Sequence, residues 1–270
     1  MQTTIDFSKT EQYNLSIRLT PDGFSFYIVD PFGGGKSVFY TSSFSNLKSQ
    51  LSQIEEIVFK HEQLLLPYRR TDLIVVSPHY TFVPNELFVE DKKEELLSFQ
   101  FHNTADKILT NSLQRIPVTN VFAMDSEIYG FLHRSFSINR VLHYATPMGE
   151  YFAERSRFGN YSKMYLHIEA THLDIFCFER NRLKLNNSLN FSQINDAAYF
   201  VLNAWEKAGL HQTDDELHLC GINDLLTEIT PLLKKYLQRV SPLNPPTDWY
   251  VSPANCEYLP LDLMTLVLCV

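Results

Sequence analysis

The same order of expected elements occurs twice along this chain. Three short strands, a helix and a buried strand follow one another in the first part, and the series returns in the second part. A repeat of this length indicates a duplicated domain and not a solenoid of small repeats. The order therefore restricts the chain to an α/β fold built from two similar halves.

The first copy begins with apolar residues that alternate with polar ones, the period of half-buried strands. Three strands are expected, at residues 13–19, 24–28 and 37–40. Pro21-Asp22-Gly23 forms the first turn between them. Apolar residues then recur at helical spacing over 47–65, and the continuous apolar run 73–76 predicts a strand covered on both faces.

The second copy repeats these features at a nearly constant offset. Its expected elements are strands at 164–170, 173–178 and 183–191, a helix at 193–208, a strand at 217–220 and a helix at 223–240. Phe24 of the first copy corresponds to Leu173 of the second, and Leu73 corresponds to Leu217. Gly209 is placed to end the first helix of this copy.

Further elements complete the halves. We expect the end of a helix or strap at 94–102, a strand at 118–123, a helix at 126–135, a strand at 140–144, a helix after Pro147 and a final helix at 262–269. The boundary between the halves falls at 158–160. This predicts two domains, residues 1–158 and residues 159–270.

Composition limits the classes of function. The chain has 270 residues, a formal net charge of -8 and 44% apolar residues. This acidic balance lacks the basic surface of a nucleic-acid binder. The first ten residues lack the apolar core of a secretion signal, and the most apolar stretch, 259–270, is too short to cross a bilayer. The four cysteines show no metal-ligand spacing. We expect a cytoplasmic protein without a nucleic-acid partner or a membrane span.

The repeated order of elements resembles the actin-like ATPase fold. The stretch 121–132, in which Asp125 precedes a helix, is similar to the strand-to-helix connection of that superfamily, and in detail resembles its members from pilus assembly and type II secretion. The resemblance implies a duplicated ribonuclease-H-like (actin-like ATPase) fold, with two βββαβαβα-type halves and mixed sheets. Those members bind partner peptides by strand addition or between their halves.

A second resemblance covers nearly the whole chain. It is carried by residues 165–178, 183–191, 196–200 and 219–221. These segments resemble the domain-of-unknown-function 3822 family of bacterial proteins, found mainly in Bacteroidetes. The resemblance implies an actin-like fold and no assigned reaction.

The actin-like resemblance implies where a nucleotide would bind. Such ATPases hold phosphates with two glycine-bearing hairpins and hold Mg²⁺ through an acidic strand residue. The matching hairpins here are 18–24, with one glycine, a proline and no acid in its strand, and 167–174, with no glycine. The base-binding glycine pair is reduced to Gly221. A divergent site would contain Thr20, Gly23, Glu169, Thr171, Asp174 and Gly221.

Two other motifs carry no catalytic chemistry. The run 33–37 ends like a P-loop, but the earlier glycine would fall at Asp30, and a strand follows where a P-loop opens a helix. His167 and Glu169 share one face of their strand, whereas His172 is expected on the other face, so the three do not form a metal site. We predict no catalytic residue and no metal site.

Two functions remain open. The first is a non-catalytic actin-like protein, a pseudo-ATPase without a cofactor, that docks a protein partner as an interaction or scaffold module. The alternative is a nucleotide-binding ATPase or switch that takes ATP with Mg²⁺ between its halves. Large side chains such as Phe24 or His172 in the cleft would exclude the alternative.

Overall fold

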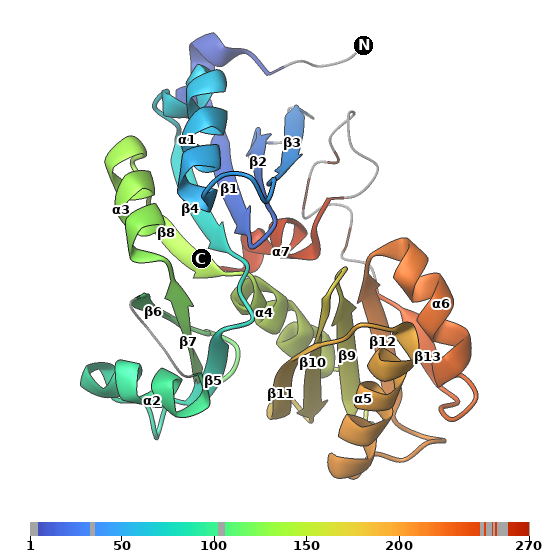
Figure 1. Ribbon diagram of the computed structural model, residues 1–270. Helices are drawn as coiled ribbons and strands as arrows, with labels where there is room; N and C mark the ends of the chain where they lie inside the picture. The colour runs from blue at the N-terminus through green and yellow to red at the C-terminus, as the bar shows by residue number, and fades with distance from the viewer. Residues whose placement is uncertain are drawn as a thin grey trace.

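The computed structural model describes residues 5–32, 36–101, 106–243, 246, 250, 252 and 259–269. Two five-stranded mixed sheets lie in separate lobes, and a three-stranded sheet extends the first lobe (Figure 1). The predicted α/β class and duplicated fold are confirmed by this arrangement.

The first sheet has the strand order β3-β2-β1-β4-β8. Its strands are β1 (Asn14–Thr20), β2 (Gly23–Val29), β3 (Ser37–Ser43), β4 (Arg70–Val75) and β8 (Arg140–His143). β1 pairs antiparallel with β2 and parallel with β4. β1 and β4 are buried along almost their whole length, as expected for inner strands with both faces covered.

The second sheet repeats this order as β11-β10-β9-β12-β13. Its strands are β9 (Lys163–Ile168), β10 (His172–Glu179), β11 (Arg182–Asn190), β12 (Glu216–Gly221) and β13 (Val240–Pro242). α5 (Ile194–Lys207) and α6 (Asn223–Leu233) bury their apolar residues against this sheet. α6 ends seven residues before the expected position 240, and the short strand β13 follows it.

The remaining helices belong to the first lobe or join the lobes. The α-helices are α1 (Gln50–Lys60), α2 (Lys93–Gln100), α3 (Ser126–Ser135) and α4 (Ala145–Ser156), and the 3₁₀ turns are η1 (Phe7–Gln12), η2 (Glu62–Leu65) and η3 (Glu90–Lys92). α4 is buried along nearly its whole length and lies between the lobes (Figure 1). The Phe152 ring of α4 stacks on Tyr165 of β9 at 4.6 Å. α4 therefore connects the cores of the two halves.

The small sheet has the order β5-β7-β6 and lies beside α2. It contains β5 (Tyr80–Pro84), β6 (Lys107–Ser112) and β7 (Val118–Met124), of which only β7 was expected from the sequence. The stretch 121–132 runs from a strand through Asp125 into a helix, as expected, since Asp125 caps the N-terminus of α3. β7 resembles a main-sheet strand because it is buried on both faces, yet it is the centre of the separate small sheet.

One side chain fastens the small sheet to the first main sheet. β8 is the edge strand of that main sheet. Asn111 of β6 donates its amide to the Val141 carbonyl at 2.9 Å and accepts the His143 N–H at 2.8 Å. The Asn111 amide thus takes the place of a further strand and covers an otherwise open sheet edge.

The last described segment returns to the first lobe. It contains α7 (Leu261–Met264) and the 3₁₀ turn η4 (Leu266–Leu268), a shorter and tighter form of the expected final helix. Leu261, Leu263 and Leu266 belong to the apolar cluster that contains the core of the first lobe and extends to Tyr165 and Phe176 of the second. Arg115 donates to the Leu268 carbonyl at 3.1 Å. The domain boundary at 158/159 stays a prediction, and these residues pack across it.

No helix in the described part of the chain is long and apolar enough to cross a membrane.

Candidate functional site

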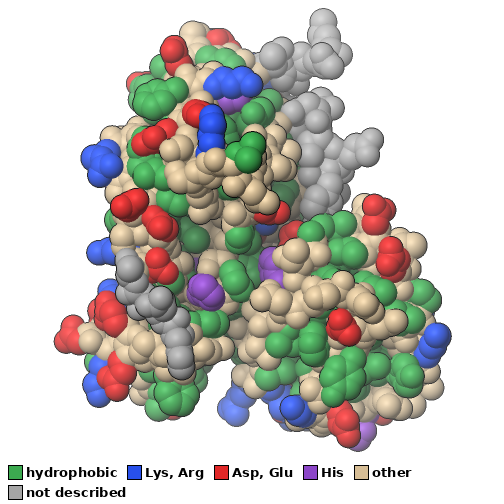
Figure 2. Space-filling model, in the orientation of Figure 1, with side chains coloured by type: hydrophobic (Ala, Val, Ile, Leu, Met, Phe, Trp, Pro, Cys, Tyr) green, Lys and Arg blue, Asp and Glu red, His purple; other side chains and the backbone are tan. Residues whose placement is uncertain are grey.

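The first hairpins of the two halves face each other across a cavity of about 290 Å³. The β1–β2 turn supplies Thr20 and Asp22, and the β9–β10 turn supplies Glu169 and Thr171. In Figure 2, charged and histidine side chains are visible where the two lobes meet. This is the position at which the sequence predicts a divergent nucleotide site.

Arg18 of β1 fills the base of this cavity. Its side chain is almost completely buried, and its Nε lies 2.7 Å from Asp262 Oδ2 of α7. A second carboxylate, Glu169 Oε1, lies 3.7 Å from Arg18 Nη2. The arginine charge is therefore matched from within the chain, by one residue of the second lobe and one of the returning segment.

Asp174 lies deeper, where both its oxygens are fully buried. The Tyr144 hydroxyl donates to Oδ1 at 2.8 Å, and the Tyr80 hydroxyl donates to the same oxygen at 3.2 Å. His167 Nδ1 lies 3.3 Å from Oδ2. Burial would raise the pKa of Asp174, but the hydrogen bond and charge of His167 outweigh burial and lower it.

His167 joins the two groups of charges. Its Nε2 lies 3.3 Å from Glu169 Oε1, on the opposite side of the ring from Asp174. Burial would lower the pKa of His167, but hydrogen bonds to Asp174 and Glu169 raise that pKa to about 9. An imidazolium therefore lies between two carboxylates. We call the row Asp262, Arg18, Glu169, His167 and Asp174 the cleft network.

The expectation that His172 lies on the opposite face from His167 was wrong. Asp174 is the cross-strand partner of His167, and such partners share a face of an antiparallel pair. His172 is two residues before Asp174, so it shares this face too, and its Nε2 lies 3.9 Å from Asp174 Oδ2. Within the residues that the structure describes, no group of three or more His, Cys, Asp or Glu side chains is arranged to hold a metal ion.

The six predicted nucleotide-site residues separate into two sets. Thr20, Glu169 and Thr171 line the cavity, whereas Gly23, Asp174 and Gly221 do not. The Thr20 hydroxyl is already engaged, since it lies 2.8 Å from Asp22 Oδ1. Of the two side chains named as obstacles, His172 lines the cavity and Phe24 is buried outside it.

The two glycines have roles in strand packing. Gly221 has a φ of +123°, and a Cβ there would lie 2.1 Å from the Ile168 carbonyl oxygen of the adjacent β9. A Cβ on Gly23 would lie 2.8 Å from the Ser42 backbone carbonyl oxygen of β3. Close approach of backbones therefore accounts for both residues without a ligand.

The residues that sequence reasoning missed are Arg18, Asp262 and Tyr144. No sequence signal was present for Arg18, because it occupies a polar position in the alternation of β1, where an exposed side chain is expected, whereas the strand is buried on both faces. Asp262 is 244 residues away from it, so no local pattern joins the two. Of the P-loop-like run, residues 33–35 lie outside the described residues, and Ser37 begins β3, so a strand follows the run as expected.

Two lobes with the same strand order, facing each other through their first hairpins, define a protein of the actin-like ATPase fold. A more particular assignment follows from the sequence. The chain belongs to the family described as protein of unknown function (DUF3822), whose profile matches residues 2–240.

Two solved structures place this family among its relatives. A Bacteroides thetaiotaomicron protein with actin-like ATPase fold and unknown function is 32% identical, covers 98% of this chain and 99% of its own, and has a TM-score of 0.87. The PilM-PilN type IV pilus biogenesis complex gives a TM-score of 0.56 at 12% identity, with 94% of each chain covered. The comparison with curated proteins gives no match.

Proposed function

We propose that this chain is a non-catalytic actin-like protein, a pseudo-ATPase, that acts by binding another protein. The observation that carries this proposal is the cleft network. Arg18 stands at the base of the cavity with Asp262 and Glu169 as its counter-charges. The chain's own side chains thus occupy and neutralise the place at which an actin-like ATPase holds phosphate and Mg²⁺.

The electrostatics of the cavity oppose a nucleotide. Asp22 and Glu169 place two carboxylates on its wall, and the Arg18 charge is already matched. Phosphates are held by backbone N–H groups and cations. Pro21 removes one such N–H from the first hairpin, and the second hairpin has no glycine to let its backbone approach. The cavity volume, about 290 Å³, lies at the lower limit of the roughly 300–1,000 Å³ of small-molecule sites.

A partner-binding role has a precedent within the fold. PilM is structurally similar to this chain and is known in a complex with PilN of type IV pilus biogenesis. That precedent supports the proposal as an analogy of fold. It motivates a direct search: the tagged chain, isolated from its native host, is expected to carry one protein in stoichiometric amount.

Thermal unfolding with and without nucleotide tests the non-catalytic half of the proposal. We expect no change in Tm with millimolar Mg-ATP, Mg-ADP or Mg-GTP. A ligand present at 100 times its Kd would stabilise the fold by about 2.7 kcal/mol, which corresponds to roughly 5 °C for a chain of this size.

A variant distinguishes true binding in the cavity from a general effect of nucleotide. Thr171→Trp places a large side chain in the cavity. An upward shift of Tm in the wild-type protein that disappears in Thr171→Trp would refute the pseudo-ATPase and establish the nucleotide-binding alternative.

A further inference from the structure

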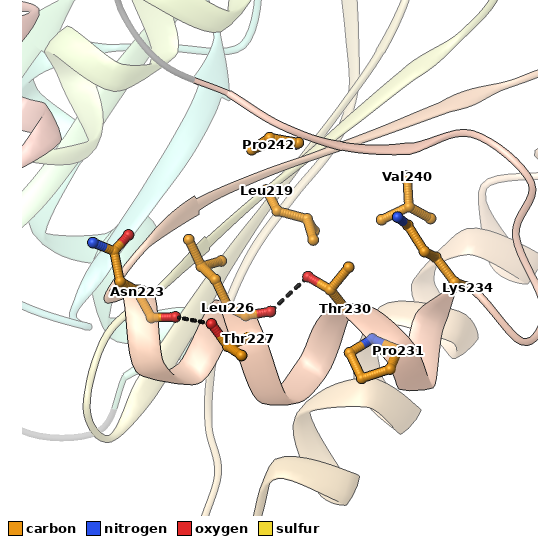
Figure 3. A pocket seen from close by; sticks show the side chains of 9 residues that line it. All are labelled: Leu219, Asn223, Leu226, Thr227, Thr230, Pro231, Lys234, Val240 and Pro242. Carbon is orange, nitrogen blue, oxygen red and sulfur yellow. Dashed lines mark hydrogen bonds between the residues drawn. The ribbon is translucent and has the colours of Figure 1, made fainter.

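A second hollow lies on the far side of the second lobe from the cleft network, between α6 and the edge strand β13. It has a volume of about 560 Å³ and is lined by residues of β12, α6 and β13 (Figure 3). Leu219 forms its floor, Leu226 and Pro231 come from α6, and Val240 and Pro242 come from β13. We call this hollow the α6–β13 groove.

The polar groups of the groove leave one charge available. Thr227 donates its hydroxyl to the Asn223 carbonyl at 3.0 Å, and Thr230 donates to the Leu226 carbonyl at 2.5 Å, so the helix itself uses both (Figure 3). Lys234 is the only charged residue among the described residues that line the groove, and it forms no ion pair with any of the described residues. A cation therefore stands at one end of an apolar channel.

The basic character extends beyond Lys234. Lys235 is its exposed neighbour at the end of α6, and Arg239 precedes β13. The Arg239 charge is partly matched by Glu216, whose Oε1 lies 3.9 Å away, and its guanidinium lies over the Tyr161 ring. The lysine side chains thus leave an excess of positive charge at this end, which favours an anionic group in a ligand.

The backbone at the groove offers hydrogen bonds as well. The Arg239 carbonyl accepts from the Leu217 N–H, and the Leu243 N–H donates to the Leu219 carbonyl. These two backbone bonds fix the side of β13 that faces β12. By strand alternation, the backbone N–H and carbonyl of Val240 point away from β12. Pro242 has no N–H to add, so this edge can pair with about one residue of an extended chain.

We propose that the α6–β13 groove is the docking site for a short extended segment of a partner protein, in which apolar side chains are followed by a carboxylate. The apolar side chains enter the groove, one residue pairs with Val240, and the carboxylate meets Lys234. This inference rests on the proposed function, because it names the surface that an interaction protein would use.

Two labelled peptides test the proposal on the full chain. One is a fluorescein-labelled heptapeptide in which five apolar residues, leucine and valine, are followed by two glutamates, and in the other the two glutamates are replaced by lysines. The apolar residues can then enter the groove while the charged end reaches Lys234. Fluorescence anisotropy is expected to show saturable binding of the glutamate peptide and at least tenfold weaker binding of the lysine peptide.

Three variants locate the binding. Lys234→Ala is expected to weaken the glutamate peptide about fivefold, the upper value for one exposed ion pair. Thr230→Trp fills the groove and is expected to abolish binding. Lys235→Ala is the matched control, since Lys235 carries the same charge without lining the groove, and it should leave the affinity unchanged.

Three outcomes would overturn the proposal. The first is that the glutamate peptide shows no saturable binding below about 1 mM. The second is that Lys235→Ala weakens the binding of this peptide as much as Lys234→Ala does. The third is that the protein forms a dimer that Thr230→Trp dissociates, because a second copy would then be the occupant. Failure of the proposed function is seen separately, as a nucleotide-dependent Tm that Thr171→Trp removes. Peptide binding with such a shift would keep the groove and discard the pseudo-ATPase.

Discussion

Between pH 6.5 and pH 9 the chain should lose the stability that the His167 imidazolium contributes. The folded-state pKa of His167 is raised from 6.5 to about 9. A raised pKa means that this contribution is complete below pH 6.5 and is lost as the pH rises through 9. The difference, 9 minus 6.5, at 1.36 kcal/mol per pH unit, corresponds to about 3 kcal/mol for this fully buried group.

The assay is urea unfolding of the wild-type protein and of His167→Gln at several pH values from 6 to 9.5. Two thiols also contribute to the pH dependence, because they lose their protons in this range only when the chain is unfolded. In the folded protein, burial raises the pKa of the Cys177 thiol to about 12 and raises the pKa of the Cys220 thiol further. Those thiols destabilise the fold at high pH in both proteins, so their effect cancels in the difference. The wild-type advantage over His167→Gln is expected to fall by about 3 kcal/mol across this range.

His143 supplies a control of opposite sign. Burial lowers the pKa of this histidine to about 3, so it is neutral in the folded protein. Its effect on stability appears only below pH 6.5, where His143 binds a proton in the unfolded chain but not in the folded chain. His143→Gln should therefore leave the stability difference constant from pH 6.5 to 9.5. A constant difference for His167→Gln as well would refute the charged imidazolium in the cleft network.

Three further predictions concern other parts of the fold. Asp262→Ala should lower the free energy of unfolding, measured with urea, by about 3 kcal/mol, because Arg18 loses its nearer buried counter-charge. Adding Arg18→Met should recover most of this loss, and a double variant as unstable as the single one would contradict the prediction. Gly221→Ala should cost at least about 3 kcal/mol in the same assay, because its Cβ would meet the Ile168 carbonyl at a positive φ, and an unchanged unfolding midpoint would show that the strands can separate there. Asn111→Leu should cost about 2 kcal/mol and speed amide exchange at the β8 edge, whose two backbone groups it leaves unpaired, and unchanged exchange would argue against that role.

The strands of both main sheets except β13 could be predicted because each shows its apolar pattern. β5 and β6 escaped prediction since their residues are partly exposed without regular alternation. β13 escaped because it has three residues and contains a proline. Sequence periodicity reports burial against neighbouring layers, so short strands at sheet edges leave little trace in it.

The candidate site could be predicted only in part. The two hairpins were placed correctly because their turns follow from local sequence. The counter-charge of Arg18 could not be predicted, since it depends on the path of a segment that returns from the end of the chain. His172 was assigned to the wrong face because the turn between β9 and β10 restarts the alternation of side chains.

The returning segment also sets an order of events for the synthesis of this protein. A ribosome completes every strand of the first lobe long before it reaches Leu261, yet Leu261, Leu263 and Leu266 pack in the apolar cluster that contains that lobe's core. Until they arrive, the newborn lobe has an uncovered apolar surface and an arginine without its nearer counter-charge. The packing of the lobe that is made first is therefore expected to be completed last, after the second lobe has been synthesised.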